Sequence, residues 1–165
     1  MDLHTILVIL HVAGVILGVG GATIAEVNLI QALRDGKIDS SEKALMHANY
    51  TVIRVGMVFV LLSGLALVWW WLTVEGNDWV ITSGKILVKD VMMGAIFLNA
   101  FLLTKHWVPL WLGAAISFTS WWGATILGLW RTSHSFWAIL IAYIIAIGLV
   151  ALAQHLIRKK FIPKH

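Results

Sequence analysis

The chain has 165 residues, of which 60% are apolar and 12% are charged. Soluble domains average about 45–50% apolar and about 25% charged residues, so this chain has too few charges to cover a soluble surface. Soluble globular, disordered and coiled-coil proteins are therefore excluded. The lack of cysteine also excludes disulfides, thiolate metal ligands and a cysteine nucleophile.

Five apolar segments are long enough to cross a bilayer. A hydrocarbon core about 30 Å thick needs about 20 apolar residues in a helix. Short links between the segments make neighbouring helices antiparallel. The sequence therefore predicts an all-α integral membrane protein, with residues 1–165 forming one domain, an antiparallel bundle of five transmembrane helices. The expected spans are 5–33, 48–74, 86–103, 108–130 and 135–157.

The links between these spans carry typical helix-end signals. Gly36 is suited to the left-handed residue that ends a helix. Asp39 is followed three residues later by Glu42, the pattern of a capping box, which predicts that the second helix begins near Ser40. The expected turns lie at 76–78, at 104–109, with Pro109 in the first turn of the next helix, and at 131–133.

The distribution of Lys and Arg predicts the orientation. Nine of these residues fall on one side of the bundle and three on the other. Because cytoplasmic loops are rich in Lys and Arg, we expect the N-terminus outside and the C-terminus in the cytoplasm, in a multi-pass protein of the plasma (inner) membrane. The basic C-terminal residues then contact anionic lipid, and no nucleic-acid partner is expected. The nine are Arg34, Lys37, Lys43, Arg54, Lys105, Arg158, Lys159, Lys160 and Lys164, and the three are Lys85, Lys89 and Arg131.

Ionisable residues at membrane depth are the first candidates for function. His11 lies on one face of the first helix with Gly14 and Gly18. Such a small-residue stripe has two interpretations. It permits close packing against another helix, or it forms the floor under a flat cofactor whose ligand is His11.

Further polar residues are expected near His11, in the outer half of the membrane. Haem b needs a histidine for its iron and cations for its propionates. The haem interpretation makes His11 and His134 the axial, metal-binding ligands and places Lys89 beside His11. Lys85 and Arg131 then hold the propionates.

A second polar group is expected in the inner half. Glu26 in the first helix and Arg54 in the second lie at comparable depth. The simplest interpretation is a structural ion pair between these helices, since charges within membranes usually pair. A proton path through the same two residues is the alternative. Asn99 is a further buried polar residue expected in the third span.

Short motifs in the first 105 residues suggest a family. The segment from Gly18 to Glu26 (Gly-Val-Gly-Gly-Ala-Thr-Ile-Ala-Glu) and the pair Lys89 and Asn99 resemble a family of small multipass bacterial and archaeal membrane proteins without an assigned function. His11 and the Ser83–Lys89 start of the third span are distantly similar to HemJ-type protoporphyrinogen oxidases and CopD-like bundles.

The HemJ-type resemblance implies a haem b site. It would be formed by His11 together with Lys85 or Lys89. The chain departs from that family in one respect: where an arginine follows the histidine of the first helix, the polar residue here is Glu26.

Three functions are compatible with these observations. The first is a haem b-binding redox protein that exchanges electrons with a quinone or another electron-transfer partner. The second is a non-enzymatic structural or accessory subunit in a homo-oligomer or larger membrane complex. The third is a proton or small-solute transporter that uses Glu26, Arg54 and Lys89.

Overall fold

The computed structural model describes residues 1–32, 39–130 and 134–161. It contains five long helices, each long and apolar enough to cross a membrane. The five predicted spans are thus confirmed: the helix ends agree within a few residues, except that the second helix begins at Ser40, eight residues before the predicted span. The helices are α1 (Leu3–Ala32), α2 (Ser40–Thr73), the short α3 (Trp79–Thr82), α4 (Gly84–Thr104), α5 (Leu110–Leu129) and α6 (Phe136–Phe161).

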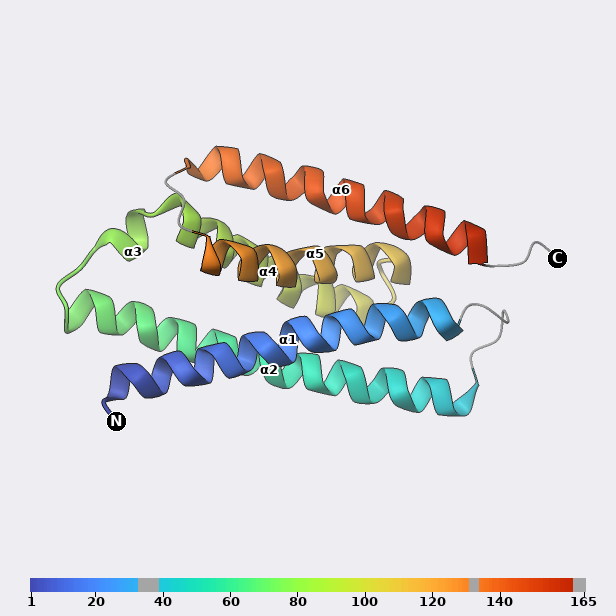
Figure 1. Cartoon of the computed structure of the whole chain (residues 1–165), viewed down its shortest axis with the longest axis horizontal. Helices are drawn as coiled ribbons and strands as arrows, with labels where there is room; N and C mark the ends of the chain where they lie inside the picture. The colour runs from blue at the N-terminus through green and yellow to red at the C-terminus, as the bar shows by residue number, and fades with distance from the viewer. Residues whose placement is uncertain (33–38, 131–133, 162–165) are drawn as a thin grey trace.

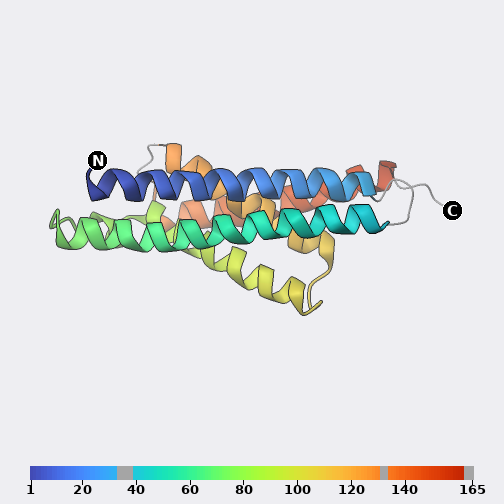
Figure 2. The same cartoon turned by 90° about the horizontal axis from the view of Figure 1, so that it is seen from below.

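The long helices run along one axis, and consecutive long helices are antiparallel (Figure 1). We call the end that holds the start of α1, together with α3, the N-terminal end of the bundle. The end that holds the end of α6 and the start of α2 is the C-terminal end (Figure 1). Helices α1 and α2 form a long pair, and α4 diverges from α2 towards the C-terminal end (Figure 2).

Glycines bring α1 and α2 together. A Cβ atom added at Gly56 would lie 2.7 Å from the backbone nitrogen of Gly18 and 2.8 Å from the carbonyl oxygen of Gly14. These distances are too short for a real side chain, so the two backbones are in direct contact. Small residues promote such contacts in membranes because they let helices approach closely.

Two clusters of buried side chains fill the bundle. The first joins the α1–α2 pair to α4 and α5, and the second joins α4 and α5 to α6. The first cluster contains Ala22, Ile53, Met57, Val60, Ile96 and Trp121, and the second contains Val88, Met92, Leu127, Ile139 and Tyr143.

The ends of the helices follow local sequence signals. Helix α2 begins at Ser40, and the capping box is confirmed: Glu42 N donates to Asp39 Oδ1 at 2.7 Å and Asp39 N donates to Glu42 Oε2 at 2.9 Å. Pro109 is the N-cap of α5, one residue before the predicted position. At the start of α1, Thr5 donates hydrogen bonds to Asp2 and lowers the pKa of that carboxyl group below its ordinary value.

The segment before α4 differs from the expected simple turn. After Gly76, whose φ of 62° suits glycine, the chain forms the extra turn of helix α3. Val80 anchors this turn because its side chain is only 1% exposed. The helix stop expected at Gly36 and the turn expected at 131–133 lie outside the described residues.

Candidate functional site

His11 lies between α1 and α2, where its imidazole has a defined partner. Its Nδ1 atom is 3.1 Å from Ser63 Oγ. The Ser63 hydroxyl donates its hydrogen to the carbonyl oxygen of Phe59 at 2.5 Å. We therefore infer that Nδ1 of His11 carries the proton and donates to Ser63, which leaves Nε2 as the acceptor nitrogen of the ring.

Of the other residues predicted to surround His11, the structure places Lys89 near it, whereas Lys85 and His134 contact Trp130. Lys89 is half-buried on α4, close enough to His11 for their charges to interact. Lys85, one turn earlier, donates from Nζ to the carbonyl oxygen of Trp130 at 2.8 Å and so joins the start of α4 to the end of α5. His134 packs against the same Trp130, with ring centroids 6.1 Å apart. Arg131 lies outside the described residues.

The glycine face of α1 is filled by protein. A Cβ atom at Gly14 would lie 2.8 Å from atoms of Phe59 and Val60, and one at Gly18 would overlap the ring of Trp121. Of the two interpretations of this stripe, the structure shows close helix packing. These glycines offer no open floor for a flat cofactor.

A cavity of about 410 Å³ lies between α5 and α6, with Met92 of α4 at its wall. His134 lines it at the N-terminal end, and most of the other lining residues are apolar. The Tyr143 hydroxyl, also in the lining, is 2.6 Å from Ser120 Oγ. His11 lines neither this cavity nor the larger one described next, so His11 and His134 do not face one shared cavity.

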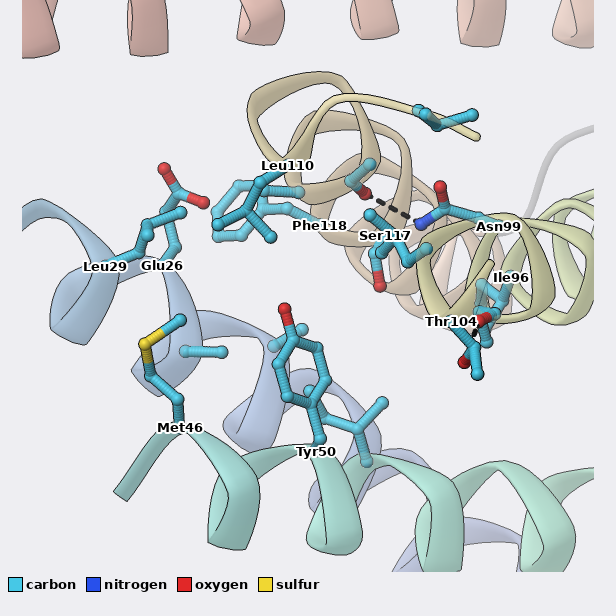
Figure 3. A pocket seen from close by; sticks show the side chains of 18 of the residues that line it. Glu26, Leu29, Met46, Tyr50, Ile96, Asn99, Thr104, Leu110, Ser117 and Phe118 are labelled. Atoms are coloured by element: carbon cyan, nitrogen blue, oxygen red, sulfur yellow. Dashed lines mark hydrogen bonds between the residues drawn. The ribbon is translucent and has the colours of Figure 1, made fainter. Parts of the chain in front are cut away.

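A larger cavity, about 450 Å³ in volume, lies in the half of the bundle nearer the C-terminal end. It separates the α1–α2 pair from α4 and α5, and apolar side chains form most of its wall (Figure 3). We call it the C-terminal cavity. Its main apolar residues are Ile53, Met57, Ile96, Leu103 and Phe118, and its polar residues are Glu26, Tyr50, Arg54, Asn99, Thr104, His106 and Ser117.

The polar residues of the C-terminal cavity come from all four helices. The hydroxyl groups of Tyr50 and Ser117 point into the space between the helices from opposite sides (Figure 3). Glu26 and Arg54 both lie close enough to Tyr50 for their charges to act on its hydroxyl group. The structure therefore brings the two charged residues that the sequence grouped together into one cavity, with a phenol beside them.

Asn99 forms part of the cavity wall. Its side chain is 3% exposed, and its Nδ2 donates to the carbonyl oxygen of Gly113 at 2.7 Å (Figure 3). This bond ties α4 to α5 next to the cavity. The Oδ1 atom of Asn99 has no hydrogen-bond partner among the described residues.

Residues of both α2 and α4 line the C-terminal cavity, and these two helices diverge towards the C-terminal end (Figure 2). Arg54 of α2 is exposed and also lines the cavity. An arginine at membrane depth is stable only next to a counter-charge, water or a polar ligand.

The hydroxyl groups of Tyr50 and Ser117, which point into this cavity, were not predicted from the sequence. Tyr50 precedes Arg54 by four residues, and residues four apart lie on the same face of a helix, so this spacing was a usable signal. Ser117 had no such signal, because nothing near it in sequence distinguishes it from the other small polar residues of α5. Only its position opposite Tyr50 makes it part of the site (Figure 3).

Comparison of the chain with protein-family models, with curated proteins and with solved structures finds no match.

Proposed function

We propose that the protein binds and carries a lipophilic small molecule with a polar head group, and that the C-terminal cavity is its binding site. The observation that supports this function is the composition of the cavity wall. It is mostly apolar, with a few polar side chains from four helices, and its volume of about 450 Å³ is typical of small-molecule sites. This proposal is related to the transporter alternative, but Lys89, which that alternative included, does not line the cavity.

The lining residues offer both apolar contact surface and hydrogen-bonding groups to such a ligand. Ile53, Met57 and Phe118 provide apolar surface for the body of the ligand. The hydroxyl groups of Tyr50 and Ser117 point inwards and can donate to acceptor atoms of a head group (Figure 3).

Filling the cavity should weaken binding. Ala114 lines the C-terminal cavity, and Ala142 lines the smaller cavity between α5 and α6. With a phospholipid that carries a diazirine on its acyl chain, we expect Ala114→Phe to reduce photolabelling of the cavity residues by about tenfold. An overpacking clash costs about 1–3 kcal/mol, and about 1.4 kcal/mol corresponds to tenfold in affinity. The matched variant Ala142→Phe should label like the wild type, and equal losses in the two variants would contradict the proposal.

Haem b binding at His11 is the second candidate function, in a redox protein with a quinone or protein partner. It is supported by the hydrogen bond from Nδ1 to Ser63, because iron-ligating histidines are generally held by such a bond at the other ring nitrogen. Haem would supply one-electron chemistry, and His11 would hold the iron. The nearby charge of Lys89 would be available to a propionate.

An absorption spectrum tests this second function. Protein expressed with added haem should show a Soret band that is lost in His11→Ala and weakened in Ser63→Ala, since loss of such a supporting bond lowers metal affinity about 10–100-fold. His155→Ala, at an exposed position on α6, is the matched control and should keep the band. A colourless wild-type protein would exclude haem.

The orientation of the bundle is also part of the proposal. The N-terminal end, with Lys85 and Lys89, is placed outside, and the C-terminal end, with the larger cavity, in the cytoplasmic half of the plasma (inner) membrane. The support is the nine-to-three distribution of Lys and Arg. A reporter fused after His165 should be active only in the cytoplasm, and periplasmic activity would reverse the orientation.

A further inference from the structure

The hydroxyl group of Ser117 lacks the partner that a helix usually provides. Within helices, serine commonly donates to the carbonyl oxygen four residues earlier, as Ser120 does to Ile116 at 2.6 Å. For Ser117 this oxygen belongs to Gly113, and it accepts a hydrogen bond from Nδ2 of Asn99 at 2.7 Å. A carbonyl oxygen has two lone pairs, and the helix itself uses the other one. The Ser117 hydroxyl makes no hydrogen bond to any described residue, so its hydrogen remains available.

The hydroxyl group of Tyr50 is available in the same way. It makes no hydrogen bond to any described residue, and it points into the space between the helices from the side opposite Ser117 (Figure 3). Both side chains line the C-terminal cavity, whose wall is mostly apolar. A polar group in apolar surroundings costs free energy unless it is hydrogen-bonded. The cavity therefore offers two donors, one from each side, that need acceptors.

The ionisable side chains of the lining are placed differently from these two hydroxyl groups. Arg54 and His106 are exposed, so water or lipid head groups can solvate them. Glu26 already takes part in an interaction within the chain. The available donors that point into the cavity are thus uncharged, and an uncharged ligand complements them without bringing an unpaired charge to membrane depth.

We propose that the C-terminal cavity, taken as the lipophile site of the proposed function, binds a lipophilic para-quinone. The ring of such a molecule is uncharged, and its two carbonyl oxygens, at opposite edges, accept hydrogen bonds and donate none. One oxygen accepts from Tyr50 and the other from Ser117. The apolar tail packs on Met57, Ile96 and Phe118.

Two acceptors at opposite edges distinguish the quinone from other uncharged lipophiles. A fatty alcohol has a single oxygen, and a fatty ester has both of its oxygens at one end, so neither reaches donors on opposite sides. Asn99 is a positioning residue in this site. By occupying the Gly113 oxygen, it keeps the Ser117 hydroxyl available for the ligand.

The test measures dissociation constants by titration calorimetry on the full-length protein in detergent micelles, with titration of empty micelles subtracted. The probes are decyl-para-benzoquinone, decylbenzene and methyl laurate. We expect the quinone to bind about tenfold more tightly than decylbenzene, as two hydrogen bonds allow. Equal affinities for these two probes would overturn the proposal. An affinity for methyl laurate equal to that for the quinone would overturn the assignment to two carbonyl groups.

Substitution of each donor should remove part of this preference. Tyr50→Phe and Ser117→Ala should each weaken quinone binding by about threefold to tenfold, the loss of one hydrogen bond, and leave decylbenzene binding unchanged. Tyr143→Phe, at the chain's other tyrosine, and Ser41→Ala, at an exposed position, remove the same groups outside the C-terminal cavity. These controls should bind the quinone like the wild type. Equal losses in the cavity variants and the controls would overturn the proposal.

The positioning role of Asn99 has its own signature. Asn99→Ala frees the Gly113 oxygen, and the Ser117 hydroxyl should then turn to it. Quinone binding should weaken as in Ser117→Ala, with no further loss when the two changes are combined. Additive losses, or an equal loss of decylbenzene binding, would overturn this role. If a variant does not fold, the preference of the wild-type protein for the quinone over decylbenzene still decides the question.

The result also distinguishes this inference from the proposed function. Photolabelling of the cavity by the diazirine phospholipid, without a preference for the quinone over decylbenzene, overturns the quinone assignment and keeps the cavity as a lipophile site. A lack of cavity labelling overturns both.

Discussion

Replacing Gly56 with leucine should strongly destabilise the bundle. A Cβ atom at this position would lie 2.7–2.8 Å from backbone atoms of Gly18 and Gly14, and backbone cannot rotate away as a side chain can. The leucine therefore forces α1 away from α2 and disrupts the first buried cluster. Overpacking costs typically about 1–3 kcal/mol, and we expect the upper part of that range, measured as the free energy of unfolding in mixed micelles with tryptophan fluorescence as the signal.

Gly20 offers a matched control on α1. A Cβ atom there meets nothing within 4 Å. Gly20→Leu should therefore leave the free energy of unfolding unchanged or raise it by up to about 1 kcal/mol, because leucine favours helix over glycine. If the Gly56 and Gly20 variants were equally stable, the direct backbone contact between α1 and α2 would be refuted.

The second large loss of stability is expected on substitution of Glu26 or Arg54. The sequence predicts that these residues form an ion pair, and the structure places both in the lining of the C-terminal cavity. Removing one member of a buried pair costs about 3–5 kcal/mol, because the other charge stays behind without compensation. Since Arg54 is exposed, part of that cost is relieved by solvent or lipid head groups, and the lower end of the range is expected for Glu26→Gln.

A double-mutant cycle measures the coupling between the two charges. Arg54→Gln should cause less further loss of stability in the Glu26→Gln background than in the wild type, by about 0.5–3 kcal/mol, as is usual for residues in contact. Lys43→Gln in the same background is the matched control and should be additive. Strictly additive losses for Glu26 and Arg54 would show that the two side chains do not interact.

Much of the fold was predictable because its causes are local. A helix that spans a membrane needs only enough apolar residues in a row, since it satisfies its backbone hydrogen bonds internally. All five spans could therefore be predicted from residue type and segment length. The start of α2 followed from Asp39 and Glu42 alone, because a capping box involves only four consecutive residues.

The short helix α3 could not be predicted in this way. Its four residues are held by the burial of Val80 against the bundle, not by a capping signal, since Asp78 makes no side-chain cap bond. The sequence therefore shows a turn there, and tertiary contacts convert it into helix.

The sites depended still more on tertiary structure. The sequence by itself determined that His11, Lys89, Glu26 and Arg54 lie at membrane depth, because hydropathy fixes depth along a helix. It left open what each residue faces, because that depends on how the helices rotate and pack. The tertiary structure decided that Trp121 covers Gly18, that Lys85 binds a carbonyl 45 residues away, and that the cavity forms around Glu26. The physical reason is that the depth of a residue in the membrane depends on the free energy of transferring nearby residues into lipid, which the local sequence determines. The partners of a side chain depend on contacts between segments that are far apart in the chain.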